Sequence, residues 1–126
     1  MGNYTEIESL KHFVLEESWV LSITACPGEL DFEIDLTFDK DHPELRAPRD
    51  GEVVYSRRGV LRFRGVSELT WRGQGNPPAT DASGQRDWGA VDSMQFAGNE
   101  YLLEGDWGII TLTAAGLEVD MTGPVD

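Results

Sequence analysis

Acidic side chains recur at every second position of residues 29–35, and this pattern is the one most able to do chemistry. The row consists of Glu29, Asp31, Glu33 and Asp35. A row of carboxylates can attract a cation or a basic protein, and paired carboxylates also carry out glycoside hydrolysis. Alternate residues of a strand lie roughly 7 Å apart on a flat face, which offers no cleft for a substrate. We therefore interpret Asp31, Glu33 and Asp35 as candidate binding residues rather than catalytic ones.

A basic strip follows the acidic row. Residues 46–72 contain seven arginines and three acidic residues, although the whole chain has a net charge of −13. Within 58–64, Arg62 and Arg64 share one face, so they could lie beside the acidic row on a neighbouring strand. Opposite charges on adjacent strands contribute roughly 0.2–1 kcal/mol per pair. The sequence leaves three interpretations of the acidic row open: a partner surface, a solvated face, or a set of cross-strand ion pairs.

Two tryptophans lie where a loop or turn is expected. Trp88 lies at the end of a long polar loop, and Trp107 lies within the turn signal Gly105-Asp106-Trp107-Gly108. Each could anchor a partner or stack on a ligand, and each could instead cover an open end of the sheet. If the fold is a barrel, Trp88 with Arg62 or Arg64 near the mouth would suit a small molecule.

Signals for metal, cofactor or covalent chemistry are weak. The group Asp39, Asp41, His42 and Glu44 has suitable ligand atoms, but its spacing matches neither an EF-hand nor a zinc site. The sequence contains no nucleophile elbow, no cysteine–histidine signature and no phosphate-binding loop. We therefore expect no metal and no cofactor, and we favour a protein that is not an enzyme.

The elements that position these residues follow from the period-two alternation of 29–38, which is typical of a half-buried strand. Centring a turn on Pro27-Gly28 pairs this strand with 19–25. Apolar residues then face apolar ones, and the expected pairs are Ala25 with Leu30, Ile23 with Phe32, Leu21 with Ile34, and Trp19 with Leu36. Because a slip of one residue would destroy every match, the register is well specified, and it places Trp19 in the core.

Two further hairpins are expected in residues 91–121. A turn at Gly98-Asn99 pairs Phe96 with Tyr101 and Met94 with Leu103. A turn at Ala115-Gly116 pairs Leu112 with Val119 and Ile110 with Met121. With a turn at 105–108 between them, the four strands form a meander.

The remaining segments complete the expected architecture. Thr5 to Glu8 reads as a capping box and predicts a short helix near 6–12. Residues 59–72 form one bent strand or two short ones, broken at Gly65, with Trp71 in the core. Two long segments, 39–56 and 73–90, do not fit strands. The fold class is therefore mainly β, an antiparallel meander of 7–8 strands that forms a barrel or a two-layer sandwich, with one short N-terminal helix.

Length and composition favour a single domain, 1–126, in a reducing cytoplasm. The N-terminus is polar and acidic, unlike a signal peptide, and no apolar run approaches the ~20 residues that a membrane span requires. The one cysteine, Cys26, has no partner for an internal disulfide. A pI near 4.3 argues against nucleic acid and anionic membranes as partners. The oligomeric state is left open.

Two stretches resemble a group of bacterial proteins. Ser-Arg-Arg-Gly-Val-Leu-Arg-Phe-Arg-Gly-Val (56–66) and Tyr-Leu-Leu-Glu-Gly-Asp-Trp-Gly (101–108) are similar to segments of small uncharacterised β-rich proteins, some of which accompany presumed immunity proteins of toxin systems. The resemblance implies a bacterial, cytoplasmic protein, and it transfers no functional residue.

The expected function is that of an immunity-like, non-enzymatic binding module whose acidic surface meets a basic protein. Such a surface would set association rate and selectivity through electrostatic complementarity. The alternative is a small-molecule-binding β-barrel with a mouth lined by arginine and tryptophan.

Overall fold

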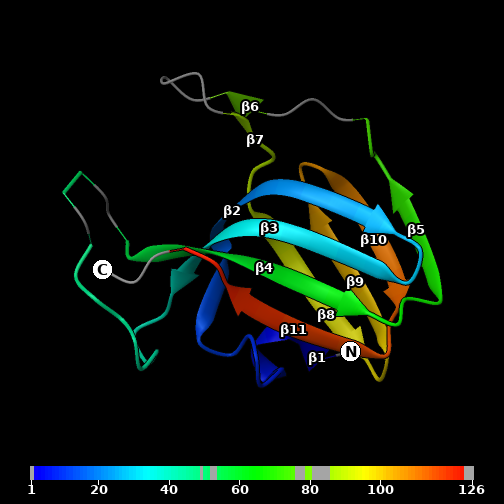
Figure 1. Ribbon diagram of the computed structural model, residues 1–126, viewed down its shortest axis with the longest axis horizontal. Coiled ribbons are helices and arrows are strands. Elements are labelled where there is room, and N and C mark those ends of the chain that lie inside the picture. The colour runs from blue at the N-terminus through cyan, green and yellow to red at the C-terminus, as the bar shows by residue number, and fades with distance from the viewer. Residues whose placement is uncertain (1, 49, 52–53, 76–78, 81–85, 124–126) are drawn as a thin grey trace.

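The computed structural model describes all residues except 1, 49, 52–53, 76–78, 81–85 and 124–126. All of its described strands except a short separate pair form two stacked antiparallel sheets, so the fold is a sandwich and not a closed barrel (Figure 1). Sheet A has the order β1-β8-β9-β10-β5, and sheet B has the order β11-β4-β3-β2. Sheet A contains β1 (Gly2–Asn3), β8 (Val91–Ala97), β9 (Glu100–Gly105), β10 (Gly108–Thr113) and β5 (Glu68–Arg72). Sheet B contains β11 (Gly116–Met121), β4 (Ser56–Arg64), β3 (Glu29–Phe38) and β2 (Phe13–Cys26).

The core lies between the two sheets and follows the alternation of the strands. Every second residue of β3 from Leu30 to Leu36 is fully buried, as are Leu61 and Phe63 of the adjacent β4. Sheet A contributes Val91, Met94, Leu103, Ile110 and Leu112 to the same core. Aromatic side chains pack in this space: the Phe32 ring lies 6.3 Å from that of Phe63 and 5.4 Å from that of Trp107, measured between ring centroids.

The first hairpin confirms the predicted register only near its turn. Ala25 pairs with Leu30 and Ile23 with Phe32, but a β-bulge between Val20 and Ser22 shifts the rest of β2. The predicted pairs of Leu21 with Ile34 and Trp19 with Leu36 are therefore wrong. Trp19 instead lies opposite Asp35 on the outer face, where half of it is exposed. An inserted residue reverses the alternation beyond it, so the bulge moves Trp19 out of the core.

The predicted four-strand meander is correct for three strands and wrong for the fourth. The β8–β9 hairpin pairs Phe96 with Tyr101 and Met94 with Leu103 as expected, and β10 returns beside β9. The chain then crosses to sheet B, where β11 pairs with β4 and not with β10. The alternation of β11 fits either neighbour, but beside β4 its carboxylates meet arginines instead of threonines.

The N-terminus forms a 3₁₀ turn over Tyr4–Glu6 and not the predicted helix at 6–12. The capping box closes two residues earlier than predicted, because the Asn3 side chain accepts the Thr5 amide and the Glu6 carboxylate accepts the Asn3 amide. Consecutive turns then continue to Phe13. Among the described residues, no helix is long and apolar enough to cross a membrane.

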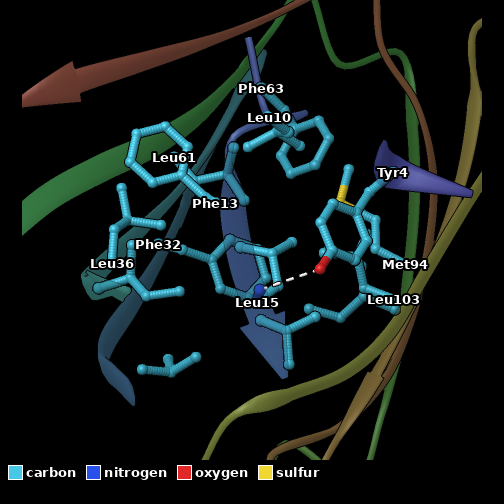
Figure 2. Packing of buried hydrophobic residues seen from close by; sticks show 14 of the residues in the cluster. Tyr4, Leu10, Phe13, Leu15, Phe32, Leu36, Leu61, Phe63, Met94 and Leu103 are labelled. Atoms are coloured by element: carbon cyan, nitrogen blue, oxygen red, sulfur yellow. Dashed lines mark hydrogen bonds between the residues drawn. The ribbon is translucent and has the colours of Figure 1, made fainter. Parts of the chain in front are cut away.

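Tyr4 fixes this N-terminal turn to the sandwich. Its side chain is buried between Met94 and Leu103 on one side and Leu15 on the other (Figure 2). The hydroxyl accepts the Leu15 amide at 3.1 Å and donates to the Glu16 carboxylate. Burial, with that bond to Glu16, raises the pKa of Tyr4 above its ordinary value.

Residues 59–72 are two strands in different sheets, which agrees with one of the two alternatives for this segment. Gly65, with φ of 63°, makes the turn between them, and a side chain there would collide with Ala115. The second long segment contains the two-residue strands β6 (Ala79–Thr80) and β7 (Arg86–Asp87), which pair with each other. The first long segment, in its described part, contains no strand before β4.

Candidate functional site

The outer face of sheet B carries a ladder of ion pairs, which we call the charge ladder. Strand β4 lies between β3 and β11, so its outward arginines have acidic neighbours on both sides. The members are Glu29, Asp31 and Glu33 of β3, Arg58, Arg62 and Arg64 of β4, and Glu118 and Asp120 of β11. The predicted site residues Asp31, Glu33, Arg62 and Arg64 thus lie together on one face.

Arg62 is the centre of the ladder. Its guanidinium lies 3.2 Å from Asp31, 2.7 Å from Asp120 and 3.8 Å from Glu29. Desolvation opposes the charge of Arg62, but the carboxylates, Asp31 first among them, outweigh it and raise the pKa of the guanidinium. Arg62 is therefore held in its charged form by residues of the same sheet.

The other arginines of the ladder are also paired. Arg58 lies 3.6 Å from Glu33, and Arg64 contacts Glu118. Asp35, the last residue of the acidic row, lies opposite Arg58 and Trp19 in the register but makes no ion pair among the described residues. Most of the acidic row is thus neutralised inside the sheet, which is the cross-strand alternative that the sequence left open.

The two candidate tryptophans take different roles. Trp107 is buried, packs its ring 5.4 Å from that of Phe32, and donates its indole N–H to the Ala90 carbonyl at 3.3 Å. Trp88 is half-buried and lines a hollow of about 70 Å³ with Ile23, Trp71, Gln74 and Trp107. Trp71, predicted to be in the core, is half-buried at this edge. No arginine is among the described residues that line this hollow, and Arg62 and Arg64, predicted to lie near Trp88, belong to the charge ladder on sheet B.

The outer face of sheet A differs from the charge ladder. We call it the open acidic face and define it by Glu100 and Glu104 of β9 and Glu68 of β5. Glu100 has Ala97 and Thr113 as its cross-strand neighbours. Glu104 has Ser93 and Ile109, and Glu68 has Thr113. None of these neighbours is a cation, and within the described chain none of the three carboxylates makes an ion pair.

A groove of about 310 Å³ crosses this face over β5, β10 and β9. Thr113 pairs with Glu68 on one side and with Glu100 on the other, so two carboxylates flank one hydroxyl at the end of the groove. The outward residues of the groove are Glu68, Thr70, Glu100, Leu102, Thr111 and Thr113. The sequence did not predict this site, because the site depends on β5 lying beside β10. The only signal for it was that Glu68 and Thr70 alternate with the apolar residues of their strand and therefore face outward.

A third polar group lies at the end of the sandwich where β3 ends. His42 stacks on Phe38 with ring centroids 4.0 Å apart, and His12 lies 6.2 Å from His42 and 3.7 Å from the Asp39 carboxylate. Burial lowers the pKa of His42, while Glu44 opposes that shift. Among the described residues, no group of three or more histidine, cysteine, aspartate or glutamate side chains is placed to hold a metal ion.

Arg57 completes this end cluster. It is an inward-facing residue of β4, 6% exposed, and lies 3.4 Å from Glu44 with its guanidinium 6.0 Å from the Phe38 ring centroid. These contacts contribute packing and charge balance at this end of the sandwich.

Comparison with known proteins does not identify a relative. No protein-family model matches this chain, and neither a curated protein sequence nor a solved structure is significantly similar to it.

Proposed function

We propose that this protein is a non-enzymatic binding module that receives a basic protein partner on the open acidic face. The observation that carries the proposal is the groove of about 310 Å³ between Glu68 and Glu100, whose described lining includes carboxylates but no cation. Arg72, the outward cation of β5, is not part of that lining. A lysine or arginine side chain from a partner would supply the missing charge.

The lining of the groove suits such a side chain. Leu102 offers apolar surface to an aliphatic stem beside Thr70 and Thr111, and the carboxylates flank one end. Lysine and arginine bury their stems on apolar surface while their charged ends reach polar groups. The groove is open to solvent over three strands, so it fits a side chain presented by another protein better than an enclosed small molecule.

The charge of the whole chain supports the same type of partner. With a net charge of −13, the protein attracts a basic molecule over distance. Such attraction raises association rates and falls with ionic strength. The charge ladder contributes little to this, because its carboxylates already contact arginines. The binding role that the sequence assigned to Asp31, Glu33 and Asp35 therefore moves to Glu100 and Glu104.

The resemblance to small bacterial proteins near presumed immunity proteins extends the proposal to an immunity-like role in the cytoplasm, in which the partner is a basic toxin. A toxin gene beside the gene for this chain would support that extension.

The test is titration of the ¹⁵N-labelled protein with a hexalysine peptide, followed by NMR. We expect shift changes on β9, β10 and β5, and at least a roughly tenfold weaker affinity for the variant Glu100→Lys/Glu104→Lys, equivalent to about 1.4 kcal/mol. The matched control is Glu33→Lys/Asp35→Lys, which changes the net charge equally on the other face. Equal weakening in both variants, or greater weakening in the control, would contradict the assignment to the open acidic face.

A further inference from the structure

Strand β5 is an exposed edge of sheet A. It is the last strand in the order β1-β8-β9-β10-β5 and lies at the rim of the molecule with no other strand beyond it (Figure 1). All of its residues except Trp71 are exposed. In the described part of the chain, only β10 pairs with it. An open edge of this kind can accept another strand, because its outer backbone groups lack a partner in the sheet.

The residues of β5 are arranged symmetrically about Thr70. Glu68 and Arg72 lie two residues before and two residues after it on the outer face, and they carry opposite charges. Leu69 and Trp71 lie one residue to each side and face inward. Glu68 and Arg72 stand roughly 13 Å apart along the strand, too far to pair with each other. Neither makes an ion pair with any other described residue.

We propose that two copies of this chain pair through β5, with the strands antiparallel and the twofold axis at Thr70. Glu68 of each copy then faces Arg72 of the other, Leu69 faces Trp71, and Thr70 faces Thr70. Partners across an antiparallel ladder lie on the same face, so even-numbered residues of β5 must pair with even-numbered ones. Of the registers that meet this condition, only the one centred on Thr70 uses all five residues and forms both ion pairs.

Apolar contacts accompany the charge pairs. Leu69 is 37% exposed, although it belongs to the inward-facing residues of its strand. It borders a hollow of about 340 Å³ next to the β2–β3 turn, and Trp71 borders the hollow of about 70 Å³. Pairing the two edges brings a second Trp71 over Leu69 and covers this apolar surface twice, as a twofold interface requires.

The pairing shares one residue with the proposed function, because Glu68 also flanks the groove. It neutralises Glu68 but leaves Glu100 and Glu104 of each copy without a cation, so two open acidic faces lie side by side on one continuous sheet. The interface is small, and both copies carry a net charge of −13, so we expect weak association. At physiological salt the repulsion between net charges is screened beyond about 8 Å, whereas the contact pairs persist.

Sedimentation over about 10 μM to about 1 mM protein, the range in which small interfaces associate, tests the pairing. We expect the wild type to become dimeric within it. Glu68→Arg and Arg72→Glu should each remain monomeric, because each places like charges opposite one another. A mixture of the two variants, and the double variant with both changes, should associate again. The control is Asp92→Arg, which changes the charge as Glu68→Arg does but at an exposed residue of β8. It should dimerise like the wild type.

Crosslinking locates the axis independently of affinity. In a Cys26→Ser background, Thr70→Cys should form a disulfide between copies under mild oxidation, because directly opposed residues have Cα atoms roughly 4.5–5.5 Å apart. Thr111→Cys, on the neighbouring strand β10, should not. A wild type that stays monomeric at about 1 mM, or a dimer unaffected by both charge variants, would overturn the proposal.

Discussion

The outer faces of the two sheets carry similar acidic residues with different neighbours. On sheet B, Asp31 lies opposite Arg62, and Asp120 contacts the same guanidinium from the other side. On sheet A, Glu100 lies between Ala97 and Thr113, with no cation across either strand. A carboxylate on a strand is therefore a sign of partner binding only when the adjacent strands leave it unpaired.

The charges of the two faces also differ in their expected effect on the stability of the fold. The charge ladder joins β3, β4 and β11, which are not consecutive in the chain, so its ion pairs help to specify which strands are neighbours. The open acidic face makes no such contribution, and its carboxylates repel one another. If it is a binding surface, the protein should become more stable when that charge is reduced, and the reverse should hold for the charge ladder.

The largest effect is expected from Arg62→Gln. The change leaves Glu29, Asp31 and Asp120 close together with no cation between them. We expect a clear fall in Tm by circular dichroism that becomes larger as salt is lowered, because salt screens the repulsion among the carboxylates. Arg72→Gln, on the other sheet, is the control and should change Tm little in dilute protein. An equal fall in Tm for both variants would show that Arg62 stabilises the fold no more than an arginine outside the ladder, so the ion pairs themselves would add nothing.

A smaller and more direct comparison uses the same substitution on both faces. Glu118→Lys places a second cation beside Arg64, and we expect a loss of about 1 kcal/mol in the free energy of unfolding. Glu100→Lys should stay within about 0.5 kcal/mol of the wild type, on the stabilising side, because it reduces the negative charge of an unpaired face. Urea unfolding measures both. Effects of the same sign would remove the distinction between the two faces.

Local patterns predicted the hairpins but not the choice of sheet. The matches around Pro27-Gly28 and Gly98-Asn99 were correct because adjacent strands and short turns leave few alternatives. The alternation of apolar residues gives no sign of the bulge near Leu21. For that reason the sequence placed Trp19 in the core, although it lies on the outer face. Strand β11 was assigned to β10 because both neighbours satisfy its apolar residues, and only the arginines of β4 distinguish them.

The same limit applies to the sites. Asp31 and Arg62 were recognised as possible cross-strand partners because two long alternating segments suggested adjacent strands. Glu68 and Glu100 are far apart in the sequence and become neighbours of Thr113 only when β5 and β9 flank β10. The charge pattern could therefore show which acids exist, but not which of them lack a cation.

The smallest expected effect is a pH dependence of stability that comes from the end cluster and that neither outer face shares. Neither outer face carries a histidine, the side chain whose charge changes most readily near pH 6, so neither face should respond there. His42 has a pKa below its ordinary 6.5, chiefly because of burial. Between its folded pKa and 6.5 the unfolded chain binds more protons, so stability should fall as pH decreases through this window and be fully present above it.

His42→Phe should flatten that dependence, because an aromatic ring can still stack on Phe38 and no longer takes up a proton. Urea unfolding at several pH values between about 5.5 and 7.5 measures the slope, which is proportional to the difference in bound protons. Asp92→Asn should keep the slope of the wild type. A His42→Phe slope equal to that of the wild type would place the response in another group facing the cluster, among which His12 lies 6.2 Å from His42. If Glu118→Lys changes the slope instead, the pH response belongs to the charge ladder. The outer faces would then contribute to the pH dependence of stability near pH 6, contrary to the prediction.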